Sequence, residues 1–173
     1  EPFAIAMDID AAGLPFLQGL TPPAGSKSVE ELKTIVSWAE RPFIIKGVMT
    51  ARGAEKALEA GASGIVVSNH GGRVLDHCPA TAEVLPEIAD AVGGKMTIFV
   101  DGAIRSGMDI FKALALGADA VLIGRPFVTS VYGGGEEGVK LYVSKLKAEL
   151  ADTMRMCGAH SLAEIDRSMI YRG

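Results

Sequence analysis

The feature that most restricts the fold of this chain is a regular alternation of short apolar segments with helical patterns. The apolar segments cover residues 3–10, 43–48, 64–67, 96–100 and 120–123. Short apolar runs without polar alternation are typical of strands that are covered on both faces, as in parallel sheets. Because helical patterns separate these runs, the sequence predicts an α/β protein with close to five successive β/α units.

Capping residues and glycines mark the helices between these segments. Ser28–Glu31 has the pattern of a capping box at the start of the first helix. The helices are expected at about 28–41, 50–61, 81–92 and 106–116, with a longer one that follows 133–135 and ends at Gly158. A second capping box at Ser161–Glu164 predicts a short terminal helix, and residues 11–27 are expected to form an irregular loop.

Polar residues follow each apolar segment, which favours a (β/α) barrel over an open sheet because all strand ends of a barrel face one mouth. A complete barrel has eight strands, so about five units leave open sheet edges. We therefore expect either an N-terminal part of the barrel or a second copy of the chain as partner. The start, Glu1-Pro2-Phe3, has no initiator Met and no basic leader, so the chain is expected to begin inside a longer protein.

The third apolar segment ends abruptly in groups that suit chemistry. His70 follows it and is itself followed by Gly71, Gly72 and Arg73. A lone histidine after a strand is more often structural than catalytic. Here two glycines let the backbone approach a ligand closely, and a planar guanidinium suits a carboxylate. We therefore favour a functional site at this strand end over a structural histidine.

Other strand ends add further candidates. They carry Asp8, Asp10, Lys46, Asp101, Gly102, Arg105, Gly124 and Arg125. The loops after the last two strands of a barrel commonly form a phosphate cradle. A single glycine there is explained by a simple turn, but a glycine with an arginine after two successive strands predicts a phosphate site.

Composition narrows the possible functions. The net charge of -4 and the pI near 5.4 provide no positive surface for nucleic acid. No apolar run approaches the length of a membrane span. Cys78 and Cys157 have neither metal-ligand nor redox spacing, so we expect no metal site and a reducing, cytoplasmic location.

Several segments carry a specific resemblance to one enzyme family. They are Ser68–Asp76 with Pro79-Ala80-Thr81, Ile44–Val48, Val100–Arg105, and Phe111–Ala118 through Gly124-Arg125-Pro126. In this order they resemble the FMN-dependent α-hydroxy-acid oxidases and dehydrogenases, which include glycolate oxidase, lactate oxidase and flavocytochrome-type lactate dehydrogenase. The similarity covers nearly the whole chain from about Arg41 onward.

The resemblance implies that residues 1–173 form one domain, the C-terminal half of an FMN-binding (β/α)8 TIM barrel, covering its last four to five β/α units. Residues 3–10 would then be the fourth barrel strand. The implied activity is FMN-dependent oxidation of a small L-2-hydroxy acid, similar to lactate or glycolate, to the 2-oxo acid. Because the family is usually oligomeric, we also expect a homo-oligomer.

The resemblance implies roles for the residues that act on the substrate. His70 would be the base that takes a proton from the substrate while the α-hydrogen leaves for the flavin, by hydride transfer or through a carbanion. Arg73 would hold the substrate carboxylate in a two-pronged hydrogen bond. Asp10 would orient the base and stabilise its protonated form, whereas Asp8 stands where the family often has Thr.

The resemblance also implies how the cofactor is bound. Lys46 would lie beside flavin N1 and O2, where its charge stabilises the reduced flavin, and Ser68 would touch the flavin as well. The ribityl phosphate would be bound by Asp101, Gly102, Ala103, Ile104, Arg105, Gly124 and Arg125.

Three departures from the family pattern leave a second interpretation open. Ala103 replaces the usual Gly, and residues 11–27 lack the usual segment with Arg and Glu. The first three barrel strands, which carry an aromatic residue near the substrate, are absent from the sequence. The alternative is a catalytically incomplete half-barrel that binds FMN or phosphate, or associates with itself, without turnover.

Overall fold

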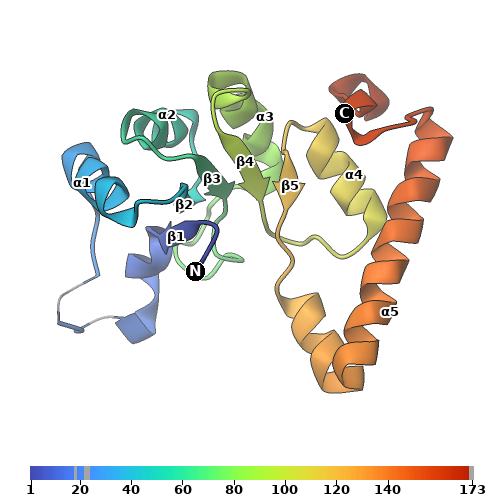
Figure 1. Ribbon diagram of the computed structural model, residues 1–173, viewed down its shortest axis with the longest axis horizontal. Helices are drawn as coiled ribbons and strands as arrows, with labels where there is room; N and C mark the ends of the chain where they lie inside the picture. Colours follow the sequence, from blue (N-terminus) through green and yellow to red (C-terminus); the bar gives the residue numbers. More distant parts are fainter. Residues whose placement is uncertain (18, 22–23, 172–173) are drawn as a thin grey trace.

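The computed structural model describes residues 1–17, 19–21 and 24–171, and a sheet of five parallel strands lies at its centre. The strands are β1 (Ile5–Asp8), β2 (Phe43–Val48), β3 (Gly64–Val67), β4 (Thr97–Val100) and β5 (Ala120–Val121). Each strand pairs with the next one along the chain, so the order in the sheet is the order in the sequence (Figure 1). The structure confirms the predicted parallel α/β architecture.

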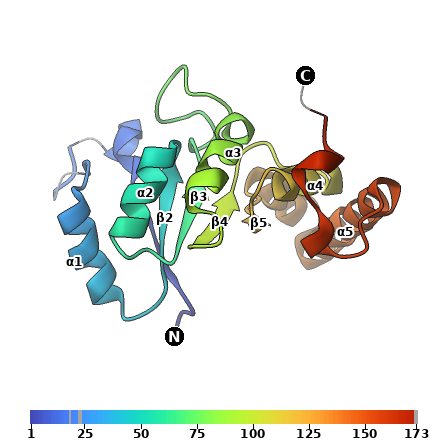
Figure 2. The same cartoon turned by 90° about the horizontal axis from the view of Figure 1, so that it is seen from above.

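Four helices connect the successive strands, as parallel pairing requires. They are α1 (Val29–Ala39), α2 (Ala51–Glu59), α3 (Thr81–Val92) and α4 (Gly107–Ala115). In Figure 1, α1, α2 and α3 lie on the same side of the strands. Seen from above in Figure 2, these three helices follow one another along the sheet in the order of the strands that they connect.

Capping boxes begin two of these helices at the predicted positions. At α1, the Glu31 amide donates to Ser28 Oγ (3.2 Å) and the Ser28 amide donates to Glu31 Oε2 (2.7 Å). At α4, the Asp109 amide donates to Ser106 Oγ (3.2 Å) and the Ser106 amide donates to Asp109 Oδ2 (3.0 Å). Each pair satisfies two amides that a helix leaves without intrahelical partners, so it fixes where the helix starts.

The hydrophobic core lies between the sheet and the helices. Ile45, Ile65, Ile88 and Ile98 are almost completely buried in one cluster that spans β2, β3, α3 and β4. All four residues of β3 are buried. Because β3 pairs with a strand on each side and is covered by the core, it holds the middle of the domain in place.

The last helix differs from the prediction. It was expected to follow residues 133–135, but α5 (Arg125–Cys157) already begins at Arg125. Pro126 is compatible with the first helical turn, where no amide donor is needed. Gly135 has a φ of 55° and a ψ of -138°, a backbone conformation open mainly to glycine. The glycine run is therefore a bend at which α5 doubles back, not the start of the helix (Figure 1).

The segment 11–27 is more ordered than the predicted irregular loop. Short 3-10 helices cover Asp10–Gly13 and Pro15–Leu17. Their i to i+3 hydrogen bonds include those from the Leu14 amide to Ala11 O (2.9 Å) and from the Leu17 amide to Leu14 O (3.0 Å). Residues 18, 22 and 23 of this segment lie outside the described residues.

The expected terminal helix is replaced by two single turns, Leu162–Glu164 and Arg167–Met169. Ser161 Oγ donates to Glu164 Oε1 (3.1 Å), so the predicted pair of side chains does meet. Asp166 then accepts from the amide of Ser168 (2.7 Å) and starts a new turn. This second cap interrupts the helix before a full α-helical turn can form.

The sheet is open at both ends within the described ranges, because β1 pairs only with β2 and β5 pairs only with β4. An unpaired strand edge offers a row of backbone donors and acceptors to another strand. In the same part of the chain, no helix has the length and apolar character needed to cross a membrane.

Ile65 tests the importance of the central strand for stability. Its side chain is 0% exposed, so the substitution Ile65→Ala leaves a cavity that the core cannot fill. We expect it to lower the free energy of unfolding by about 2–5 kcal/mol, measured by urea denaturation. Leu75→Ala is the control, because Leu75 is 67% exposed and its truncation is expected to change stability by less than about 0.5 kcal/mol. Equal effects of the two substitutions would contradict the assigned core.

Candidate active site

The carboxyl ends of β2, β3, β4 and β5 gather most of the predicted site residues around one cavity. The cavity has a volume of about 370 Å³. Its lining includes Lys46, His70, Arg73, Asp101, Gly102, Ala103, Ile104, Arg105, Gly124 and Arg125. Parallel strands end at the same edge of a sheet, which explains how residues far apart in the sequence meet here. Asp10 and Ser68 do not line the cavity but lie behind His70.

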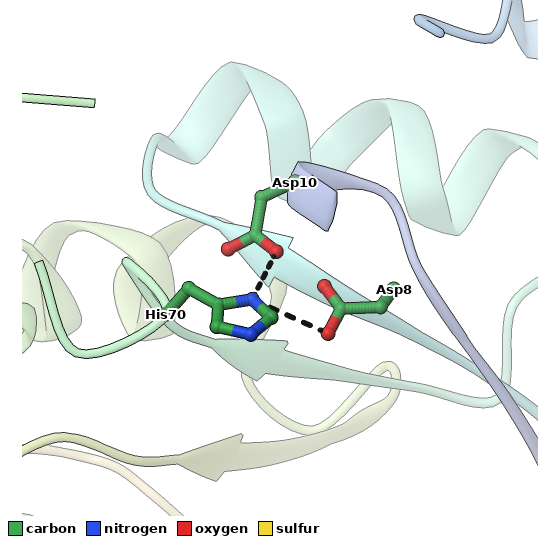
Figure 3. A group of neighbouring side chains, drawn as sticks. All are labelled: Asp8, Asp10 and His70. Carbon is green, nitrogen blue, oxygen red and sulfur yellow. Dashed lines mark hydrogen bonds and ion pairs between the residues drawn. The ribbon is translucent and has the colours of Figure 1, made fainter. Parts of the chain in front are cut away.

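A histidine, two carboxylates and a lysine are in contact at the ends of β1, β2 and β3. His70 Nδ1 lies 2.8 Å from Asp10 Oδ1 and 3.4 Å from Asp8 Oδ2 (Figure 3). The Lys46 ammonium donates to Asp8 Oδ2 at 2.9 Å and lies 3.4 Å from His70 Nδ1. With Nδ1 engaged by carboxylates, Nε2 is the ring nitrogen left for a substrate, and within the described residues it has no partner.

The two carboxyl groups of this cluster have different proton affinities. Burial and the neighbouring carboxyl of Asp8 raise the pKa of Asp10, although its hydrogen bond with His70 acts in the opposite direction. Burial alone would also raise the pKa of Asp8, but hydrogen bonding with Asp10 and Lys46 outweighs burial and lowers it. Asp8 is therefore the more acidic of the two carboxyl groups and stays the charged partner of Lys46.

Asp8, Asp10 and His70 also have the spacing of a possible metal site, since one ligand atom of each lies within 4.8 Å of the others. The Lys46 ammonium already lies against Asp8 at 2.9 Å. A metal ion bound there would have to lie beside this positive charge, which opposes cation binding. We therefore assign the cluster to proton chemistry, and the absence of a metal stays a prediction.

The backbone after β3 turns sharply to present His70 to the cavity. His70 itself has a φ of 56°, which is uncommon for a residue with a side chain. Two contacts hold it there, the hydrogen bond with Asp10 and the bond from the His70 amide to Ser68 Oγ (3.1 Å). Gly71 also has a positive φ, and a Cβ atom at that position would lie 3.0 Å from the Arg125 guanidinium. The φ of 69° favours glycine at this position.

Arg73 and Ser68 receive clear local positions. The Nε of Arg73 donates to the carbonyl of His70 (3.2 Å), and its outer guanidinium nitrogens have no partner among the described residues. Ser68 is fully buried, and its hydroxyl accepts the His70 amide. Ser68 thus supports the turn that presents His70, while its predicted contact with a flavin stays a prediction.

The opposite side of the cavity is suited to an anion. Among the described residues, the backbone amides of Ala103 and Ile104 have no acceptor, and Arg105 and Arg125 line the same cavity. One guanidinium nitrogen of Arg105 donates to the carbonyl of Ala103 (3.2 Å), which holds the side chain against this loop. Ala103 adopts a φ of 59°, which turns this loop away from regular structure. Free amides and two arginines form the donor set that a phosphate group requires.

Two residues of the site were not assigned a role from the sequence. The sequence favours Asp10 over Asp8, but the structure places both carboxyl groups beside His70 Nδ1. Thr81 donates its hydroxyl to the carbonyl of Asp101 (2.6 Å) and so supports the loop 101–105 on the anion-binding side of the cavity. The segment Pro79-Ala80-Thr81 was noted as a motif, but no local signal connects a threonine to a strand 20 residues away.

Comparison with known proteins identifies the family of this chain. Residues 16–172 match the family described as FMN-dependent dehydrogenase. The glycolate oxidase of Spinacia oleracea is 49% identical over 144 residues, which are 83% of this chain and 38% of that protein. A peroxisomal (S)-2-hydroxy-acid oxidase of Oryza sativa subsp. japonica is 46% identical over 151 residues, which are 87% of this chain and 40% of that protein. The chain belongs to the FMN-dependent dehydrogenase family.

Solved structures agree with this assignment. A mandelate oxidase variant with (S)-mandelic acid superimposes with a TM-score of 0.85 at 35% identity, over 95% of this chain and 54% of that one. Mandelate oxidase itself gives a TM-score of 0.79 at 40% identity, over 83% of this chain and 42% of that one. The fold is therefore part of a (β/α)8 barrel, as predicted. The chain spans about two fifths of the length of the curated relatives described above.

The residues of the cavity fit the cofactor that gives the family its name. Asp101 Oδ1 is buried and has no hydrogen-bond partner among the described residues, so it can accept from a hydroxyl group of a bound ligand. FMN carries hydroxyl groups on its ribityl chain as well as a phosphate group. The unpaired carboxylate oxygen, the free amides of Ala103 and Ile104 and the two arginines match these groups.

Asp10 is expected to determine which nitrogen of His70 carries the proton. In Asp10→Ala, Nδ1 loses its nearest acceptor, so we expect the Nε2-protonated tautomer to increase at neutral pH. Nitrogen-15 NMR of the imidazole ring measures the tautomer directly. Asp76→Ala is the control, because Asp76 contacts only the exposed His77 and should leave the His70 signals unchanged. An unchanged His70 tautomer in Asp10→Ala would show that Asp10 does not orient the ring.

Proposed function

We propose that this chain carries the base and the phosphate site of an FMN-dependent enzyme that oxidises a small L-2-hydroxy acid to the 2-oxo acid. The observation that carries the proposal is the 2.8 Å contact of His70 with Asp10 beside a cavity that also holds Arg73 and two further arginines. A base, a carboxylate-binding cation and an anion site in one cavity suit this reaction. Membership of the family supports it.

His70 would act as the base of the reaction. Its Nδ1 is engaged by Asp10, so Nε2 accepts the proton of the substrate hydroxyl as the α-hydrogen departs. The carboxylate of Asp10 then stabilises the imidazolium that forms. Asp8 holds Lys46 in place. The Lys46 ammonium therefore stays next to His70 without taking part in the proton transfer.

Arg73 would bind the carboxylate of the substrate. Its backbone follows His70 by three residues, and its Nε is tied to the His70 carbonyl at 3.2 Å, so the base and the carboxylate-binding group are held by one turn. A guanidinium can bind a carboxylate through two parallel hydrogen bonds, which fixes the position and the rotation of the α-carbon.

FMN, when bound, supplies the acceptor for the two electrons that leave with the α-hydrogen. We propose that Lys46, Asp101, Gly102, Ala103, Ile104, Arg105, Gly124 and Arg125, which all line the cavity, hold it. The flavin contact of Ser68 stays a prediction, because Ser68 is fully buried and does not line the cavity. The Lys46 ammonium would stabilise negative charge on the reduced cofactor. Asp101 is better suited to accept from a hydroxyl group than to bind phosphate, because two anions repel each other. Arg105, Arg125 and the free amides would bind the phosphate.

The substrate class rests on the shared chemistry of the relatives. Their names include glycolate oxidase, 2-hydroxy-acid oxidase and mandelate oxidase, which all denote action on a 2-hydroxy acid. Lactate and glycolate are the substrates we propose to test first. The cytoplasmic location and the homo-oligomer also stay predictions, and some relatives are named as peroxisomal.

A second candidate function is binding of FMN without turnover. The chain spans about two fifths of the relatives' length, and both sheet edges are open within the described residues. A missing N-terminal half of the barrel or a second copy of the chain would then complete the fold. Retention of FMN without reaction towards lactate or glycolate would favour this candidate.

Replacement of His70 tests the proposed base. We expect the purified chain to retain FMN and to lose its visible flavin absorbance when glycolate or lactate is added without oxygen. In His70→Asn we expect retained FMN but at least about 100-fold slower bleaching, because the base is lost. His77→Asn is the matched control, since His77 is exposed and does not line the cavity. Equal bleaching rates in all three proteins would remove the role of His70.

Replacement of Arg73 tests the proposed grip on the carboxylate. Arg73→Lys keeps the positive charge but loses the forked geometry, so we expect KM for the 2-hydroxy acid to rise roughly tenfold with FMN binding unchanged. Arg52→Lys on α2 is the control and should leave KM unchanged. An unaltered KM in Arg73→Lys would place the carboxylate elsewhere in the cavity.

A further inference from the structure

The bend at Gly135 divides α5 into two arms, and the first arm starts at the anion-binding side of the cavity. The first arm begins at Arg125, which lines the cavity, and the chain doubles back at Gly135 (Figure 1). Phe127 on the first arm and Tyr142 on the second pack edge to face, with ring centroids 5.1 Å apart and an interplanar angle of 75°. This aromatic pair links the second arm to the turn that carries Arg125.

Tyr142 also contacts the other arginine of the site. Its hydroxyl donates to the backbone carbonyl of Arg105 at 2.9 Å. The backbone amide of Arg105 donates to Asp109 Oδ2 at 3.0 Å. The backbone of Arg105 is therefore held from two sides, by the cap of α4 and by α5. Tyr142 therefore contacts the backbone of Arg105 through its hydroxyl and Phe127, on the arm of α5 that begins at Arg125, through its ring.

The start of α4, which directly follows the loop 101–105, is fixed to the second arm of α5. The amide of Gly107 donates to Glu149 Oε2 at 2.8 Å. A Cβ atom at Gly107 would lie 2.1 Å from the Leu150 amide nitrogen, so the backbones touch with no space for a side chain. The start of α4 therefore has a fixed position against α5, which makes the tyrosine contact at the loop a stable one.

We propose that Tyr142 is a positioning residue that sets the spacing of Arg105 and Arg125 for a single phosphate group. The inference rests on the proposed function and adds the means by which its cofactor phosphate is selected. Two guanidinium groups can share one phosphate only when their separation matches its oxygens. A tether to both arginine-bearing segments maintains that separation before the ligand arrives, which lowers the entropy lost on binding.

The environment of Tyr142 keeps its hydroxyl in the donating form. Burial and the negative charges of Glu149 and Asp109 raise the pKa of Tyr142. The phenol therefore remains protonated at neutral pH and can donate to the Arg105 carbonyl. The contact does not depend on a bound ligand, because both partners belong to the protein.

Tyr142→Phe tests the proposal because it removes the hydroxyl and keeps the ring that packs on Phe127. The measurement is titration of the purified chain with FMN and, in parallel, with riboflavin, which lacks the phosphate. We expect Kd for FMN to rise about three- to tenfold, the effect of one hydrogen bond, and Kd for riboflavin to stay within about twofold. Phe127→Leu loosens the same tether from its other end and is expected to show the same selective loss.

Tyr132→Phe is the matched control. Tyr132 lies on the first arm of α5, is 90% exposed and has no polar partner within the described residues, so the same chemical change there should leave both Kd values unaltered. Weakening of FMN and riboflavin by the same factor in Tyr142→Phe would overturn the positioning role, and so would an unchanged Kd for FMN. A parent chain that binds FMN no better than riboflavin would instead overturn the proposed phosphate site, and the inference with it.

Discussion

The parallel pairing of β3 with β2 on one side and β4 on the other is the constraint on which the site depends. It brings the ends of strands from separate units to one edge, so that Lys46, His70 and Asp101 line the same cavity. The apolar burial of β3 maintains this arrangement, since each of its residues is enclosed between neighbouring strands and helices. The packing of β3 at the centre of the sheet thus holds the site residues at the carboxyl edge in position.

The same arrangement explains why an unusual backbone conformation is stable at His70. A positive φ at a residue with a side chain is unfavourable by itself, so surrounding contacts must enforce it. Ser68 holds the amide and Asp10 holds the ring, and both belong to strand ends that the sheet positions. The contact between Asp8 and Lys46 completes the cluster by placing a compensating cation beside the two acids. No member of the cluster is held by its own segment alone.

Local patterns in the sequence predicted the strand and helix order, the capping box at Ser28, the start of a helix at about residue 106, and the strand ends that form the site. These features depend on residues close together in the chain. The bend of α5 at Gly135 was not predicted, because a glycine run marks a bend and a helix start equally well. The tether from Tyr142 to Arg105 spans 37 residues, and the bond from Thr81 to Asp101 spans 20. Such contacts follow from tertiary packing, for which the sequence has no local signal.

His70 and the anion-binding side of the cavity are adjacent at one point. Arg125 begins α5, and a Cβ atom at Gly71 would lie 3.0 Å from its guanidinium. Gly71 directly follows His70, so the start of α5 borders the turn that presents His70 to the cavity. The second arm of α5 in turn holds the Arg105 loop. One helix therefore borders the His70 turn at its first residue and holds the Arg105 loop with its second arm, so the relative position of these two parts of the cavity depends on α5.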